Sequence, residues 1–62
     1  MVDVNDRDRF RYYSKISGQE LTWRITEEML RKWNHDESIY VIEQTDDCPI
    51  RYELAAFVKK YL

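Results

Sequence analysis

Residues 9–16 of the chain, Arg-Phe-Arg-Tyr-Tyr-Ser-Lys-Ile, are the stretch that decides the fold. Every second residue from Phe10 onward is apolar or small, and the residues between them are basic or aromatic. This period of two is typical of a strand with one buried face. Residues 17–20 are a turn signal in which Gly18 can take a positive φ angle. Leu21, Trp23 and Ile25 then alternate with polar residues, so the pattern predicts a β-hairpin over residues 9–25 with one apolar face.

The rest of the chain predicts a helix, two strands and a second helix, in that order. Thr26 is a suitable N-cap, and Glu27 and Glu28 follow it in the first turn, where the helix dipole favours acids. A helix is therefore expected over residues 27–35. Residues 38–43 are β-branched and aromatic and predict a third strand. A turn at residues 45–47 leads to a fourth strand over residues 48–52, and residues 53–62 carry apolar side chains at helical spacing.

The two halves of the chain resemble each other in pattern when Phe10 is aligned with Ile39, and two amphipathic segments can align in this way with or without common descent. The fold is predicted as α+β, with two successive ββα units (ββαββα) that form an antiparallel sheet with both helices on one face. Residues 1–8 show no periodicity and are predicted to be a flexible N-terminal lead-in. Residues 9–62 are expected to form a single small domain.

Composition limits how such a domain can be stabilised. A chain of 62 residues buries only about 60% of the surface that it exposes when unfolded, so its stability margin is small. The single cysteine, Cys48, cannot form an internal disulfide, and one cysteine with one histidine cannot complete a structural zinc site. The acidic N-terminus and the lack of a long apolar run argue against a secretory signal or a membrane span. We expect a cytoplasmic protein without a metal.

No stretch of the sequence matches a catalytic motif. Glycine-rich phosphate loops, nucleophile elbows and metalloprotease helices are all absent from it. His35 is expected to be a cation at a helix end, and Cys48 a small hydrophobic residue at the start of a strand. The sequence therefore predicts a protein that is not an enzyme and uses no cofactor.

The face of the predicted sheet that points away from the core is the candidate binding surface. By strand parity it combines basic and aromatic residues, which are enriched at protein-binding hot spots and also stack on nucleic-acid bases. A solvated face, on which these side chains pack only on each other, explains the pattern as well. The predicted partner-binding residues are Arg9, Arg11, Tyr13, Lys15, Arg24, Tyr40 and Arg51, and Thr22 and Ile42 are expected on the same face. A separate acidic rim is expected from Asp36, Glu37, Glu43, Asp46 and Asp47.

Residues 26–61 resemble the winged helix–turn–helix domain of phage terminase small subunits and excisionases. Three pieces carry the resemblance: Thr26-Glu27-Glu28-Met29-Leu30-Arg31-Lys32-Trp33, then Tyr40-Val41-Ile42-Glu43, and last Tyr52-Glu53-Leu54-Ala55-Ala56-Phe57-Val58-Lys59-Lys60-Tyr61. In that family the first piece is the recognition helix, the hairpin is the wing and the last piece is the closing helix. The resemblance implies DNA binding through the 27–35 helix and the 39–52 hairpin.

The functional hypothesis from sequence is a non-enzymatic protein-interaction module. This description fits an accessory factor or inhibitor of a phage or mobile element that binds and blocks a host protein. A homodimer formed through the same face is a variant of this hypothesis, since self-association would add the stabilisation that a small domain needs. The alternative is the DNA-binding regulator that the resemblance implies. No membrane partner is expected.

Overall fold

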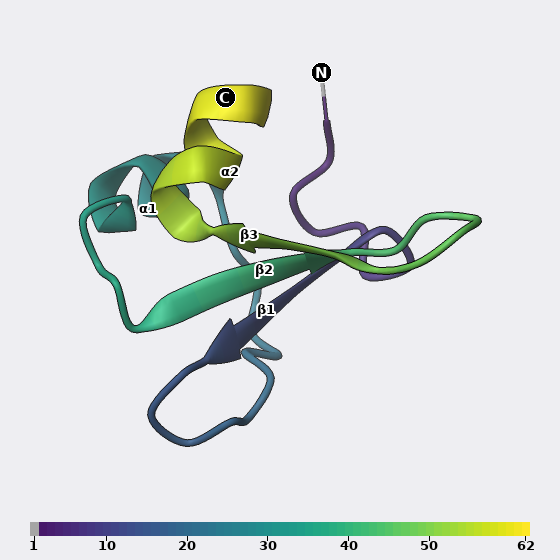
Figure 1. Ribbon diagram of the computed structural model, residues 1–62. Coiled ribbons are helices and arrows are strands. Elements are labelled where there is room, and N and C mark those ends of the chain that lie inside the picture. Colours follow the sequence, from purple (N-terminus) through teal and green to yellow (C-terminus); the bar gives the residue numbers. More distant parts are fainter. Residues whose placement is uncertain (1) are drawn as a thin grey trace.

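The computed structural model describes residues 2–62, which form one antiparallel sheet and two helices (Figure 1). The elements follow in the order β1 (Phe10–Ser14), α1 (Glu27–Trp33), β2 (Ile39–Glu43), β3 (Ile50–Glu53) and α2 (Leu54–Tyr61). The strand order in the sheet is β1-β2-β3. The predicted α+β class and the antiparallel sheet are confirmed.

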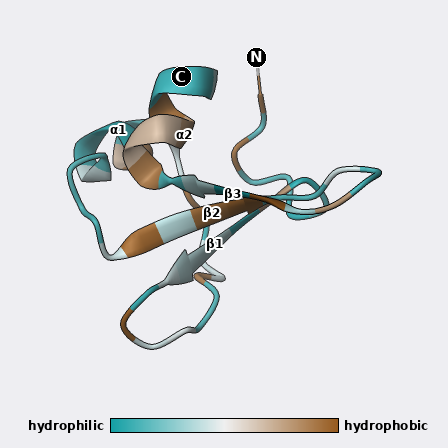
Figure 2. Cartoon of the chain, in the orientation of Figure 1, coloured by the Kyte–Doolittle hydropathy of each residue, from teal (hydrophilic) through white to brown (hydrophobic). Residues whose placement is uncertain are grey.

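The central strand β2 sets the register of the whole sheet. Val41 lies opposite Tyr12 on one side and Tyr52 on the other. Figure 2 shows hydrophobic residues concentrated along this strand, which is the central strand of the sheet. Val41 is fully buried, and it shares the core with Val4, Phe10, Tyr12, Leu21, Ile25, Leu30, Leu54, Phe57 and Val58.

The first of the two expected hairpins is reduced to one isolated bridge, between Tyr13 and Glu20. Gly18 takes the positive φ angle predicted for the turn, at 73°. Beyond Leu21 the backbone finds other partners, because Arg7 Nη2 donates to the Trp23 carbonyl at 2.7 Å and the Asn5 amide bonds to both backbone groups of Ile25. Side chains from the N-terminal segment thus replace the strand ladder over residues 22–25.

Two residues expected in the core are largely exposed. Trp23 is 52% exposed, so its predicted inward position is wrong. Ile50 is 41% exposed, although its pairing with Glu43 places it on the core side of the sheet. Trp23 lies on the segment that does not continue the sheet, where strand parity no longer fixes the direction of a side chain. Ile50 begins the edge strand β3, which has a neighbour on one side only in the described part of the chain.

The N-terminal segment, predicted as a flexible lead-in over residues 1–8, packs against the core over its described residues 2–8. Val4 is only 4% exposed, and its carbonyl accepts a hydrogen bond from the Tyr12 hydroxyl at 2.7 Å. Burial raises the pKa of this phenol. The guanidinium of Arg7 lies 5.1 Å from the centre of the same ring. The lead-in is therefore part of the domain, and sequence periodicity missed it because the two apolar side chains that pack on the core, Val2 and Val4, are too few to show a period.

Both helices begin and end close to the predicted positions. The Thr26 hydroxyl caps α1 by accepting from the Met29 backbone at 3.1 Å, and acids occupy the first turn as expected. α1 ends at Trp33, two residues before the predicted end. α2 packs on β2, β3 and α1, and it buries Leu54, Phe57 and Val58. Within residues 2–62, neither helix has the length and hydrophobicity needed to cross a lipid bilayer.

Candidate functional site

The candidate site is the outer face of the sheet, which we define as the side opposite the buried Tyr12 and Val41. The ladder arranges its side chains in two rows across the strands. The first row, called here the tyrosine row, contains Glu20, Tyr13, Tyr40 and Glu53 in spatial order. The second row, called the arginine row, contains Arg11, Ile42 and Arg51. Four of the seven residues predicted from sequence therefore meet on one surface: Arg11, Tyr13, Tyr40 and Arg51.

The aromatic centre of the outer face is preorganised by stacking. The rings of Tyr13 and Tyr40 lie parallel, with an interplanar angle of 17° and a centroid distance of 5.4 Å. The guanidinium of Arg51 sits over the Tyr40 ring, 4.0 Å from its centroid, in cation–π geometry. All three side chains come from different strands, so only the folded sheet brings them together. Side chains that already pack on one another lose little conformational entropy when a partner binds.

Charges surround this aromatic centre in an ordered way. Acidic Glu20 and Glu53 stand at the two ends of the tyrosine row, and both ends of the arginine row are basic. Arg11 Nη1 lies 3.9 Å from Glu20 Oε1, and the Lys15 ammonium lies 2.5 Å from Glu53 Oε2. Lys15, one residue beyond β1, is thus held at the margin of the outer face. Its ammonium donates to Glu53 and lowers the pKa of that carboxyl.

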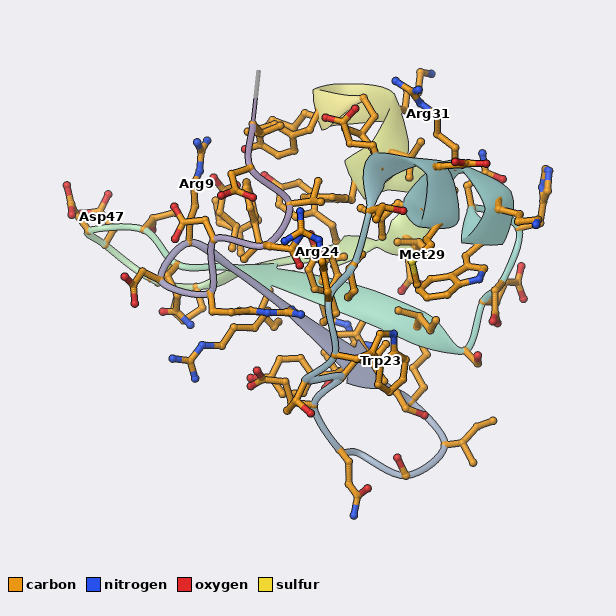
Figure 3. All side chains as sticks on the ribbon, turned by 180° about the vertical axis from the view of Figure 1, so that it is seen from behind. Arg9, Trp23, Arg24, Met29, Arg31 and Asp47 are labelled. Carbon is orange, nitrogen blue, oxygen red and sulfur yellow. The ribbon has the colours of Figure 1, made fainter. Side chains whose placement is uncertain are left out.

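Two of the predicted partner-binding residues lie elsewhere. Arg24 belongs to the segment between the β1 turn and α1, beside Trp23, as Figure 3 shows. Arg9 precedes β1 and turns to the core side of the sheet, where its Nε lies 3.3 Å from Glu43 Oε2. Its guanidinium covers the rings of Phe10 and Tyr61, with centroid distances of 4.8 and 5.4 Å. Neither residue is part of the outer face.

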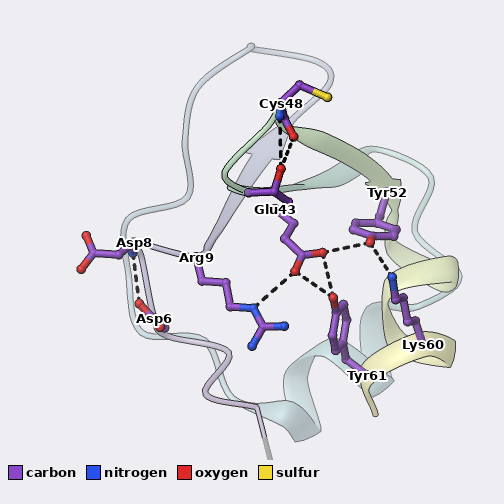
Figure 4. Close-up of polar contacts among 9 residues, drawn as sticks. Asp6, Asp8, Arg9, Glu43, Cys48, Tyr52, Lys60 and Tyr61 are labelled. Carbon is purple, nitrogen blue, oxygen red and sulfur yellow. Dashed lines mark hydrogen bonds and ion pairs between the residues drawn. The ribbon is translucent and has the colours of Figure 1, made fainter.

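A buried carboxylate is the feature that sequence reasoning missed. Glu43 was expected in an exposed acidic rim, but it is only 7% exposed. Figure 4 shows its carboxylate among the hydroxyls of Tyr52 and Tyr61 and the side chain of Arg9. Tyr52 donates at 2.9 Å, Tyr61 donates at 2.7 Å to Oε1, and Lys60 in turn donates to the Tyr52 hydroxyl at 2.9 Å. The Glu43 network ties β2, β3, α2 and the start of β1 together.

The alternation of residues in the third predicted strand already indicated that Glu43 is buried. Glu43 continues the inward series of Ile39 and Val41, so a charged residue stood at a predicted core position. Burial of the carboxyl acts to raise its pKa, but the hydrogen bonds from Tyr61, Tyr52 and Arg9 outweigh that effect and hold the pKa of Glu43 below its usual value of 4.5. The carboxylate is therefore charged, and its donors stabilise that charge.

We expect the free energy of unfolding to fall as the pH drops below 4.5. The folded-state pKa of Glu43 lies below the ordinary value of 4.5 for a glutamate, which is the value expected in the unfolded chain. A lowered folded-state pKa contributes stability above the unfolded pKa, and this contribution is lost as the pH falls through the folded pKa. Urea titrations of the wild type and Glu43→Gln between pH 7 and pH 3, followed by circular dichroism, measure the effect. The variant should lose less stability over this range, and parallel curves would contradict the assignment.

A shallow depression of about 500 Å³ lies between the end of α1 and the start of α2. His35 and the carboxylates of Asp36, Glu37 and Glu53 line it together with Lys15. Asp36 is held by Ser38, whose hydroxyl and backbone N–H both donate to its Oδ1 and lower the pKa of the carboxyl.

Cys48 is exposed in the β2–β3 turn, where its backbone bonds to the Thr45 hydroxyl. Among residues 2–62, no group of three or more His, Cys, Asp or Glu side chains could hold a metal ion.

The chain was compared with protein families, with curated proteins and with solved structures. No family model matches it, and neither a curated protein nor a solved structure shows significant similarity.

Proposed function

We propose that this chain is a non-enzymatic protein-interaction module and that the outer face of its sheet is the contact surface. The observation that carries the proposal is the stacked pair of Tyr13 and Tyr40 with Arg51 over it, displayed on a sheet face rather than in the core. Tyrosine and arginine are, with tryptophan, the residue types enriched at the hot spots of protein interfaces. Ile42, in the middle of the arginine row, adds an apolar contact beside them.

The proposal takes both helices to lie on the core face of the sheet, which leaves the outer face open. In support, Leu30 of α1 and Phe57 of α2 are fully buried in the same core as Phe10 and Tyr12. Figure 1 is consistent with this arrangement, because the two helices lie side by side above the strands. A module built in this way acts by occupying the surface of its partner, so its effect is steric and requires no reacting group.

The test is affinity capture with a variant that removes the centre of the face. Tyr40→Ala combined with Arg51→Ala should lose the proteins that the wild type retains, because truncating hot-spot residues costs about 2 kcal/mol or more each. Lys32→Ala combined with Lys59→Ala is the matched control, since both lysines are exposed on the helices. Retention of the same proteins by all three chains would contradict the proposal. Circular dichroism melts establish that the variants are folded.

DNA binding is a second candidate, and the order of elements favours it. α1 is followed directly by the β2–β3 hairpin and then by α2, in the order of a recognition helix, a wing and a closing helix. Two features oppose it. Glu27 and Glu28 occupy the first turn of α1, and Asp46 and Asp47 lie in the hairpin turn, where a wing would approach phosphates. Between residues 2 and 26 the structure has no helix that could serve as the first helix of the motif.

Fluorescence anisotropy with labelled duplex DNA decides between the two candidates. A DNA-binding chain should bind at low salt, and its affinity should fall linearly on a log–log plot against salt concentration, with a slope set by the phosphates contacted. The protein-interaction proposal expects no duplex binding even at low salt, in agreement with a net charge of −2.

A further inference from the structure

We propose that the partner which fits the outer face is a second copy of this chain, in a dimer whose two-fold axis runs perpendicular to the strands. This inference rests on the proposed function and names the occupant of the same surface. What carries it is the order of charges in the two rows. The two rows share an end at β3, where Glu53 closes the tyrosine row and Arg51 closes the arginine row, so the face is complementary to itself in one orientation. Glu20, one segment beyond Arg11, has no counterpart in the arginine row.

That orientation follows from symmetry. Two sheets packed face to face are related by a two-fold axis that lies between them. An axis perpendicular to the strands places the tyrosine row of one copy over the arginine row of the other. Glu53 then faces Arg51 of the partner subunit, and Tyr40 faces Ile42 of the partner subunit. Each of these contacts occurs twice, so the dimer gains two ion pairs and two apolar contacts.

The other simple orientation is electrostatically unfavourable. An axis parallel to the strands and passing through β2 places Arg11 over Arg51 of the partner subunit, and both such contacts bring like charges together. It also places Glu53 over the ring of Tyr13 of the partner subunit, whose face carries partial negative charge. Like charges in an interface suppress a mode of association. Charge alone therefore selects the perpendicular axis.

The size of the face sets the strength of the contact. The strands are at most five residues long, and with the Glu20 segment the face is four chain segments wide. At about 3.3 Å per residue and about 4.8 Å per segment, it measures roughly 17 by 19 Å. This is well below the about 800 Å² per partner of a standard interface, so we expect a weak dimer that forms at high micromolar concentrations.

Sedimentation equilibrium from about 10 µM to about 1 mM tests the inference directly, since this concentration range brackets the dissociation constant expected for a weak dimer. The wild-type mass should rise from one chain toward two with concentration. Arg51→Glu and Glu53→Arg each replace an ion pair by a repulsion twice per dimer. Each variant alone should weaken self-association by at least about tenfold. Lys32→Glu, on an exposed position of α1, should leave it unchanged.

The decisive arm is an equimolar mixture of the two variants. In a mixed dimer with the perpendicular axis, both pairs between positions 51 and 53 again join opposite charges. The mixture should therefore associate nearly as well as the wild type, although each variant alone self-associates at least about tenfold more weakly. A folding defect in either variant cannot produce this gain, because the mixture contains the same chains.

Two results would overturn the inference. The first is a wild-type mass that stays at one chain up to about 1 mM, a concentration at which even a weak dimer of this interface class is populated. The second is a mixture of the two variants that associates no better than either variant alone. The proposed function fails separately. A monomeric wild type that captures another protein, and loses it with Tyr40→Ala and Arg51→Ala, would keep the protein-interaction module and exclude the second copy as its partner.

Discussion

Replacing Phe57 with alanine is expected to lower the free energy of unfolding by about 3–5 kcal/mol. Phe57 is fully buried in α2 and packs edge-on against Phe10 and Tyr12, with centroid distances of 5.1 and 5.9 Å. A chain of 62 residues has a total stability of about 3–9 kcal/mol. The substitution would therefore remove at least about a third of the stability, and all of it at the lower end of that range. Urea unfolding followed by far-ultraviolet circular dichroism measures the change.

Trp23→Ala is the matched control for this prediction. Trp23 has the larger side chain, but it is 52% exposed and contributes little to the core. We expect its loss to cost about 1 kcal/mol or less. If the two substitutions destabilise the protein equally, the position of the core in the structure is wrong. The sequence pattern alone predicts the opposite order, because it places Trp23 inside the sheet.

The second large effect is expected at Glu43. Glu43→Ala should lower the free energy of unfolding by about 2–3 kcal/mol, since it removes the charged acceptor of three side chains. The hydroxyls of Tyr52 and Tyr61 would lose their shared partner, and Arg9 would lose its ion pair. Thermal and urea unfolding at pH 7 measure the loss.

Glu37→Ala is the control for the Glu43 substitution. Glu37 is exposed after α1, so its removal should change stability by less than about 0.5 kcal/mol. Glu43→Gln keeps the shape of the side chain and one acceptor oxygen, so it should fall between the wild type and Glu43→Ala. A neutral Glu43→Ala would show that the hydroxyls find water as readily as the carboxylate, and the network would then not hold α2 to the sheet.

Much of the outer face could be predicted from sequence because strand parity is a local property. Once β1 and β2 are strands, alternate residues must lie on opposite sides, and Arg11, Tyr13 and Tyr40 follow from the buried positions of Tyr12 and Val41. Arg9 could not be placed in this way. It lies just outside β1, where parity ends, and its direction depends on an acid 34 residues later in the chain.

The sequence by itself determined the α+β class, the two capped or amphipathic helices, the order of elements after residue 26 and the alternation that opens with Phe10. These features depend on periodicity, capping and turn chemistry, which act over a few residues. Only the tertiary structure decided that residues 22–25 leave the sheet, that the N-terminal segment packs on the core, and that Glu43 is buried. Each of these depends on contacts between distant parts of the chain. Asn5 and Arg7 take the backbone partners that a strand would have used, and two tyrosines with Arg9 make burial of a charge favourable.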